Sequence, residues 1–131
     1  MYNEKVLEIF KKSKNAGQIS GASGIGKTGN VQCGDIIKIY IKVNAAGVIT
    51  DAKFKTFGCV SAIASTDVAC DMIRGKTVEA ALKVTNKDVL DVLGGLPIQK
   101  IHCSVLAQDA IAKAVADYHK RLARAKAKSK K

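Results

Sequence analysis

Residues 36–57 read IIKIYIKVNAAGVITDAKFKTF, and this stretch decides the fold because apolar and charged side chains alternate along it. In its first half the odd positions from 37 to 43 are apolar, whereas positions 38 and 42 are lysines. In its second half, apolar positions 52 and 54 alternate with lysines at 53 and 55. A period of two is typical of a half-buried β-strand, and the intervening NAAG has the composition of a turn. We therefore predict an antiparallel hairpin with strands at 36–43 and 48–57.

The two far ends of this hairpin carry reactive residues. Asp35 precedes the first strand and follows Cys33-Gly34, and Cys59 comes two residues after the second strand. Antiparallel pairing brings the start of one strand beside the end of the next, so we expect both thiol segments at one edge of the sheet. A third motif, His102-Cys103-Ser104, lies 44 residues beyond Cys59.

These five side chains have the chemistry of a metal or sulfur site. Thiolates are soft donors suited to iron-sulfur clusters or zinc, and a carboxylate or imidazole can complete a four-coordinate site. The intervals of 26 and 44 residues between the cysteines are far longer than the tight pairs of zinc ribbons and ferredoxins. We therefore predict an open site assembled by tertiary structure, with candidate donors Cys33, Asp35, Cys59, His102 and Cys103.

Amphipathic stretches predict helices on both sides of the hairpin. We expect them at 2–13, 61–74, 77–83 and 85–94, and from 102 or 104 past Tyr118. Thr85 and Asp88 resemble a capping box, and the last helix has an apolar stripe expected to pack on the sheet. The stripe consists of Leu106, Ile111, Val115, Tyr118 and Leu122. The fold class is α+β, with a short antiparallel sheet packed against several helices.

Two of the cysteines fall at predicted helix starts. Cys59 just precedes the helix at 61–74, and Cys103 occupies the first turn of the last helix. The positive end of a helix favours thiolate over thiol, so both should be nucleophilic and ready to bind metal. Cys70 lies in mid-helix among apolar residues, and we assign it to packing. His119 lies in a basic helix end and is expected to be solvated.

Residues 15–34 are dense in glycine, which predicts a mobile or tightly turned segment. Within it, residues 21–28 read GASGIGKT and match the P-loop pattern of nucleotide-binding proteins. That pattern requires a buried strand before it and a helix after it, and neither is predicted here. We therefore interpret the segment as a flexible loop over the cysteine site; a P-loop enzyme would instead bind nucleotide through Lys27.

Length and charge limit the remaining possibilities. A chain of 131 residues fits one domain, placed at 1–119, with a basic helix end or disordered tail at 120–131. Seven basic residues fall in that tail and account for most of the net charge of +11, so the charge does not indicate a nucleic-acid-binding surface on the domain. No aromatic residue lies among the tail charges to stack on bases. With no apolar leader and no long apolar run, we expect a cytoplasmic protein without a membrane span.

Taken together, the motifs resemble those of the IscU/NifU-type iron-sulfur cluster assembly scaffolds. The resemblance extends from Tyr2 to about Tyr118, and its strongest stretches are Cys33-Gly34-Asp35, residues 53–65 and residues 100–107. It implies a helix, antiparallel sheet and helices in that order, with about three strands. It also implies a non-catalytic scaffold on which a transient cluster, expected to be [2Fe-2S], is built and then passed to apo-proteins.

The resemblance also assigns roles and partners. Cys103 would accept persulfide sulfur from a cysteine desulfurase, Cys33 and Cys59 would be the other thiolate ligands, and Asp35 would keep the centre exchangeable. Lys100 would lie beside the site. Residues Leu96–Lys100 resemble the segment that a DnaK-type chaperone recognises, with Ile98 and Gln99 as departures. A monomer or weak homodimer is expected.

One alternative remains open within the same fold. A zinc-containing sulfur-acceptor protein would relay persulfide between enzymes and use similar ligands. His102 before Cys103 favours the scaffold, because the zinc-type relatives usually lack that histidine. Zinc could occupy the same donors in either protein.

Overall fold

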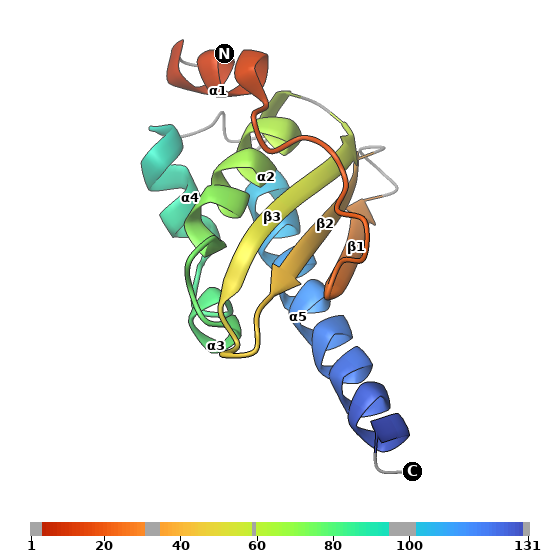
Figure 1. The fold of residues 1–131 in the computed structure, drawn as a ribbon. Helices are drawn as coiled ribbons and strands as arrows, with labels where there is room; N and C mark the ends of the chain where they lie inside the picture. The colour runs from red at the N-terminus through yellow and green to blue at the C-terminus, as the bar shows by residue number, and fades with distance from the viewer. Residues whose placement is uncertain (1–3, 31–34, 59, 95–101, 130–131) are drawn as a thin grey trace.

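The computed structural model describes residues 4–30, 35–58, 60–94 and 102–129 (Figure 1). Three strands and five helices make up this part of the chain, which confirms the α+β class. In chain order they are α1 Glu4–Lys12, β1 Gly24–Asn30, β2 Asp35–Val43, β3 Ile49–Phe57, α2 Val60–Ile73, α3 Val78–Ala81, α4 Asn86–Leu93 and α5 His102–Ser129. None of the described helices is long and apolar enough to cross a membrane.

The predicted hairpin is confirmed within one residue at its ends. β2 lies in the middle of an antiparallel sheet of order β1-β2-β3, and its Ile39 pairs with Phe54 of β3. The turn forms because the Asn44 side chain accepts hydrogen bonds from two backbone N–H groups, those of Ala46 and Val48. Gly47 follows with φ of +81°, which glycine adopts without steric cost.

One face of the sheet is covered by helices, and the other is not. Ile37, Ile39 and Ile41 are fully buried on the covered face, where α2 and α5 pack behind the sheet in Figure 1. α5 supplies the buried residues Leu106, Ala107, Ala110, Ile111, Ala114 and Val115. Leu122 is 37% exposed and lines a hollow with Ser23 and Val43, so it lies at the end of the sheet and is less covered than the rest of the predicted stripe. The reason is geometric: β1 starts at Gly24, level with Tyr118, and α5 continues past the end of the sheet.

The prediction of a loop over residues 24–30 was also wrong, because these residues form the edge strand β1. Two glycines of this segment, Gly24 and Gly26, allow close packing. A Cβ built at Gly24 would lie 2.3 Å from the Ala114 carbonyl oxygen, and one at Gly26 would lie 2.1 Å from that of Ala110. Both distances are far below van der Waals contact, so only glycine allows α5 to approach this closely. The same strand excludes a P-loop, which needs its glycines in a loop before a helix.

Both edges of the sheet are protected. At the β1 edge, the backbone N–H of Ile25 donates to Asp117 of α5, whose carboxylate also pairs with Arg121. At the β3 edge, the backbone of residues 15–17 runs beside Phe54 and exchanges hydrogen bonds with it in both directions. Covered edges of this kind limit unwanted strand pairing.

The shorter helices carry the predicted end signals. Thr77 caps α3, and Thr85 and Asp88 form the predicted capping box of α4. α4 ends at Gly94 in the left-handed conformation, as its sequence indicates. These helices and α1 cover the outer side of α2, and the buried core extends through them by way of Val6, Val78, Val89 and Leu93.

Candidate functional site

The backbone of Asp35 lies at one end of the sheet, together with the ends of the two other strands. Asp35 opens β2 and pairs with Asn30, the last residue of β1. The next residue, Ile36, pairs with Phe57, the last residue of β3. The end of β1, the start of β2 and the end of β3 therefore meet, as the sequence predicts for a hairpin.

The start of α5 lies at the same end. α5 runs antiparallel to β1, because Gly24 contacts Tyr118 whereas Gly26, further along the strand, is closest to Ala110. The four residues from Gly26 to Asn30 cover about 13 Å of strand, which is the length of about nine helical residues. Gly26 lies beside residues 110–114 of α5, and nine residues before them is the start of the helix. Asn30 is therefore level with the first turn of α5, which begins with His102-Cys103.

Of the five predicted donors, Cys33 and Cys59 lie outside the described residues. For Asp35, His102 and Cys103 the structure describes the backbone and not the side chains. No three histidine, cysteine, aspartate or glutamate side chains within the described set are arranged to hold a metal ion. The mutual distances of the five donors stay a prediction, as do the role of Lys100 and the chaperone segment Leu96–Lys100, which also lie outside the described residues.

Cys70 and His119 could also bind a metal, but the sequence predicts other roles for them, and the structure describes both side chains. Cys70 is fully buried in α2, which confirms its assignment to packing. Its burial raises the pKa of the thiol far above the ordinary range, so the group stays protonated and is a poor metal ligand. His119 is exposed on α5, as predicted, and its ring contacts that of Tyr118.

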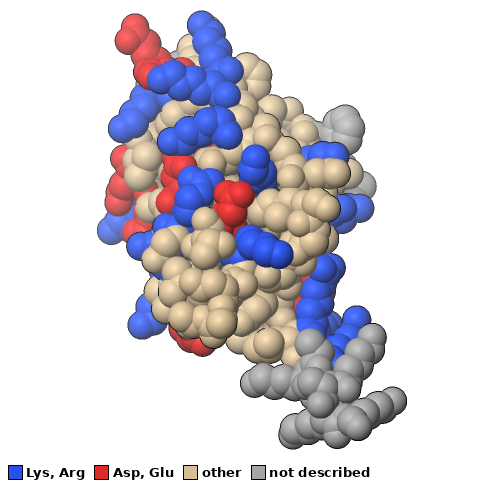
Figure 2. Space-filling model, in the orientation of Figure 1, with Lys and Arg blue, Asp and Glu red and all other residues tan. Residues whose placement is uncertain are grey.

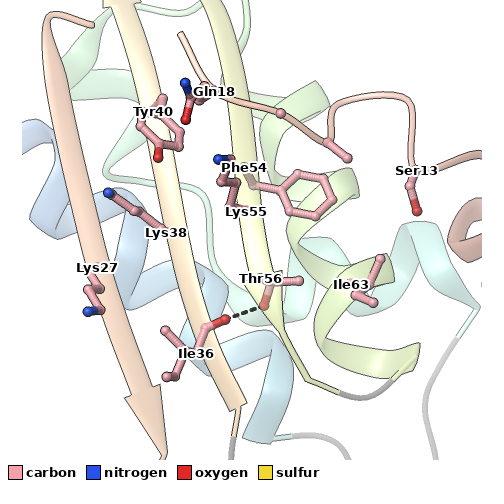
Figure 3. Close-up of a pocket in the computed structure, with 12 residues that line it drawn as sticks. Ser13, Gln18, Lys27, Ile36, Lys38, Tyr40, Phe54, Lys55, Thr56 and Ile63 are labelled. Carbon is pink, nitrogen blue, oxygen red and sulfur yellow. Dashed lines mark hydrogen bonds between the residues drawn. The ribbon is translucent and has the colours of Figure 1, made fainter. Parts of the chain in front are cut away.

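A hollow of about 810 Å³ opens on the uncovered face of the sheet. Lys27, Lys38 and Lys55 lie along it on three neighbouring strands, directly opposite one another in register (Figure 3). The sequence pattern does not indicate this row, because Lys27 belongs to it only when residues 24–30 form a strand.

The segment that borders the hollow is anchored by a buried polar cluster that the sequence did not reveal. Asn15 is only 4% exposed; its backbone N–H donates to the Asp67 carboxylate at 2.9 Å, and its side chain donates to Asp71 at 3.1 Å. Arg74 joins the cluster through Asp71 at 3.0 Å and through the side-chain oxygen of Asn15. These contacts fix the segment after α1 against α2.

The two carboxylates of this cluster have opposite pKa shifts. Burial raises the pKa of Asp67 despite its hydrogen bonds from Asn15. Burial also acts upward on Asp71, but hydrogen bonds from Lys14, Asn15 and Arg74 outweigh it, and the pKa of Asp71 is lowered. Asp71 is therefore the charged partner of the two basic side chains.

Comparison with known proteins agrees with this architecture. A family model described as the NifU-like N terminal domain matches residues 1–125. The iron-sulfur cluster assembly scaffold protein IscU 1 of Archaeoglobus fulgidus is 50% identical over 121 residues, covering 92% of this chain and 78% of that protein. IscU of Escherichia coli is 44% identical over 120 residues, covering 89% of this chain and 93% of that protein. The nitrogen fixation protein NifU of Nostoc is 47% identical over 124 residues, which cover 41% of its length.

Solved structures give the same fold. A putative scaffold protein for the SUF system from Fervidobacterium islandicum superposes with a TM-score of 0.75 at 24% identity, covering 87% of this chain and 96% of that one. A NifU-like N-terminal domain from Brucella abortus also gives 0.75, at 18% identity, covering 90% of this chain and 94% of that one. At these sequence identities, the solved structures show a shared fold and nothing about function. With the family model spanning residues 1–125 and IscU proteins matching at up to 50% identity, the chain belongs to the IscU/NifU family of NifU-like N-terminal domains.

Proposed function

We propose that this protein is a scaffold on which an iron-sulfur cluster is assembled and from which it is transferred to apo-proteins. Its membership of the IscU/NifU family supports this, since several relatives at 44–50% identity are named as iron-sulfur cluster assembly scaffolds. The structural observation that supports the proposal is that the end of β1, the start of β2, the end of β3 and the first turn of α5 lie at the same end of the sheet.

The proposed ligands come from the segments at that end. Cys33 belongs to the connection between β1 and β2, Cys59 to the connection between β3 and α2, and Cys103 to the first turn of α5. Asp35 and His102 are the candidates for the fourth ligand. Such a set suits iron and sulfide, which prefer thiolates, and a carboxylate or imidazole in place of a fourth thiolate weakens the hold on the cluster. Weaker holding favours transfer.

Helix ends support the reactivity of two of these thiols. α2 begins at Val60, directly after Cys59, and Cys103 is the second residue of α5. The unpaired N–H groups and the positive dipole end of a helix stabilise thiolate relative to thiol. Cys70 has the opposite environment, because its burial raises its pKa. The fold thus favours Cys59 and Cys103 over Cys70 as sites of sulfur chemistry.

Sulfur delivery can be written as thiol exchange. The Cys103 thiolate attacks the terminal sulfur of a persulfide on a cysteine desulfurase, forming an S–S bond on Cys103 while the enzyme's thiolate leaves. Reduction of that sulfur to sulfide takes two electrons, which an external reductant must supply. The proposal also includes a cysteine desulfurase as sulfur donor, apo-protein recipients and a cluster of the [2Fe-2S] form. It further includes a cytoplasmic location and a chaperone contact at Leu96–Lys100. Zinc is expected to compete for the same ligands.

Anaerobic reconstitution tests the proposal. The protein is incubated with Fe²⁺, a cysteine desulfurase, cysteine and dithiothreitol, visible absorption is followed, and apo-ferredoxin is then added as the recipient. We expect a cluster that transfers to ferredoxin in the wild type and in Cys70→Ala, and no cluster in Cys33→Ser, Cys59→Ser or Cys103→Ser. Asp35→Ala should form a cluster that is released more slowly. Wild-type yield in the triple serine variant would exclude the proposal.

A further inference from the structure

Three lysines form a row across the uncovered face of the sheet. Lys38 of β2 pairs with Lys27 of β1 on one side and with Lys55 of β3 on the other. Directly opposite residues in a sheet share a face and their Cβ atoms lie about 5 Å apart, so the three lysine side chains leave the sheet close together on one face. Figure 3 shows the three side chains on successive strands of this face.

Acidic side chains do not balance this row among the described residues. The described ion pairs use Lys12, Lys14, Arg74 and Arg121, and none includes a lysine of the row. In Figure 2, which shows the same side of the molecule as Figure 1, acidic atoms lie mainly toward the side of α1, α2 and α4. Like charges placed directly opposite one another oppose folding, so the row favours a ligand of opposite charge.

The row borders a hollow that has ligand dimensions. Its volume of about 810 Å³ lies within the roughly 300–1,000 Å³ of small-molecule sites. Ile36, which is 42% exposed, and Ile63 give it an apolar part, and Ser13 and Gln18 lie at its border (Figure 3). The Lys38 ammonium lies 5.2 Å from the centre of the Tyr40 ring, a cation–π contact that orients it.

The border of the hollow is fixed before any ligand binds. Gly17 donates its N–H to the Phe54 carbonyl at 2.7 Å, and the buried Asn15 holds the preceding residues against Asp67. A site that is already formed loses little conformational entropy on binding. This favours a compact ligand that fits between the 13–18 segment and the lysine row.

We propose that this hollow binds a small organic anion that carries at least two carboxylate or phosphate groups and a short apolar part. The lysines repel a bare metal cation. Tyr40 and Phe54 are 6% and 2% exposed, so neither ring is free to stack on a nucleobase. The described lining of the hollow includes none of the proposed cluster ligands, although Ile36 directly follows Asp35 in the chain. The inference does not depend on the proposed function.

Calorimetric titration of the full chain with two probes tests this inference. Citrate represents polycarboxylates and inorganic triphosphate represents polyphosphates, each titrated at matched ionic strength. We expect saturable binding of at least one probe, with the stronger response identifying the anionic group. Lys38→Gln should weaken binding about tenfold, the loss expected for one charged hydrogen bond. Thermal melting of the variant checks that it is folded.

Lys113→Gln is the matched control, because Lys113 is an exposed lysine on α5, outside the hollow. It should bind both probes as the wild type does. Cys33→Ser should also bind normally, which separates this inference from the cluster proposal. The inference is overturned if neither probe binds at millimolar concentration, or if Lys113→Gln weakens binding as much as Lys38→Gln does.

Discussion

Replacing Gly26 by alanine should separate α5 from the sheet. The added Cβ would lie 2.1 Å from the Ala110 carbonyl oxygen and 2.4 Å from the Ala114 backbone nitrogen. Both contacts are with helix backbone, so no change of rotamer relieves them. An ordinary carbon–oxygen contact is about 3.5 Å, so the helix must move by roughly 1 Å or more.

The loss of stability comes from the weaker packing between α5 and the sheet after this movement. Ala107, Ala110, Ile111 and Ala114 are at most 1% exposed between α5 and the sheet. A gap of 0.5–1 Å removes about a quarter to a half of the dispersion energy of each contact, and overpacking typically costs about 1–3 kcal/mol or more. Alanine regains about 0.5–1 kcal/mol over glycine in a strand. We expect a net loss of about 2–3 kcal/mol in the free energy of unfolding.

Urea denaturation followed by circular dichroism measures this loss. Lys27→Ala is the matched control, because Lys27 is the next residue of the same strand and is exposed on the opposite face; it should change stability by less than about 0.5 kcal/mol. Combining Gly26→Ala with Ala110→Gly should not restore stability, since the obstructing atoms belong to the backbone. A Gly26→Ala protein as stable as the wild type would refute the close-packing argument.

The remaining predictions concern charge and burial. Lys55→Gln should raise stability by about 0.5 kcal/mol at low salt, because it removes one charge of the lysine row and leaves the contact of Lys38 with Tyr40 in place. The gain should shrink with added salt, and an equal or larger gain in 1 M salt would contradict this. Burial raises the pKa of Asp67 in the folded state above its ordinary value of 3.8, so the wild type loses stability as the pH rises and this carboxyl ionises. Asp67→Asn has no carboxyl to ionise at this position. The variant should therefore gain stability relative to the wild type as the pH rises. Urea midpoints measured from pH 3 to 7 check it, and a constant difference would rule it out. Cys70→Ala should lower stability by about 1 kcal/mol or more through a small cavity, while the protein reconstitutes a cluster normally; loss of the cluster would show that Cys70 has a chemical role.

The hairpin, the helix ends and the burial of Cys70 could be predicted because each depends on local pattern. Alternation fixes which face of β2 is buried, and the Thr85-Asp88 pair specifies its own cap. β1 could not be predicted in this way, because its glycines are typical of a loop when considered alone. They are explained only by the backbone of α5, more than eighty residues away, which packs against them.

Features that join distant segments were missed for the same reason. Asn15 is buried through partners 52 and 56 residues away, and the polar residue itself gives no sign of them. The lysine row requires the register of β1 on β2, whereas the sequence predicts a loop at residues 24–30. Leu122 continues the apolar stripe of α5, but it lies at the end of the sheet beside Val43 and stays partly exposed. For the candidate site, the hairpin predicts that Asp35 and the end of β3 meet, and the direction of α5 brings its first turn to the same end.

Thiols from three distant segments are proposed to bind one metal centre, and Co²⁺ titration under anaerobic conditions tests this most directly. Tetrahedral Co²⁺ shows a thiolate charge-transfer band whose intensity rises with the number of coordinated thiolates. We predict that Cys33→Ser, Cys59→Ser and Cys103→Ser each lower that band, whereas Cys70→Ala leaves it unchanged. A wild-type band in any one of the three serine variants would contradict the claim.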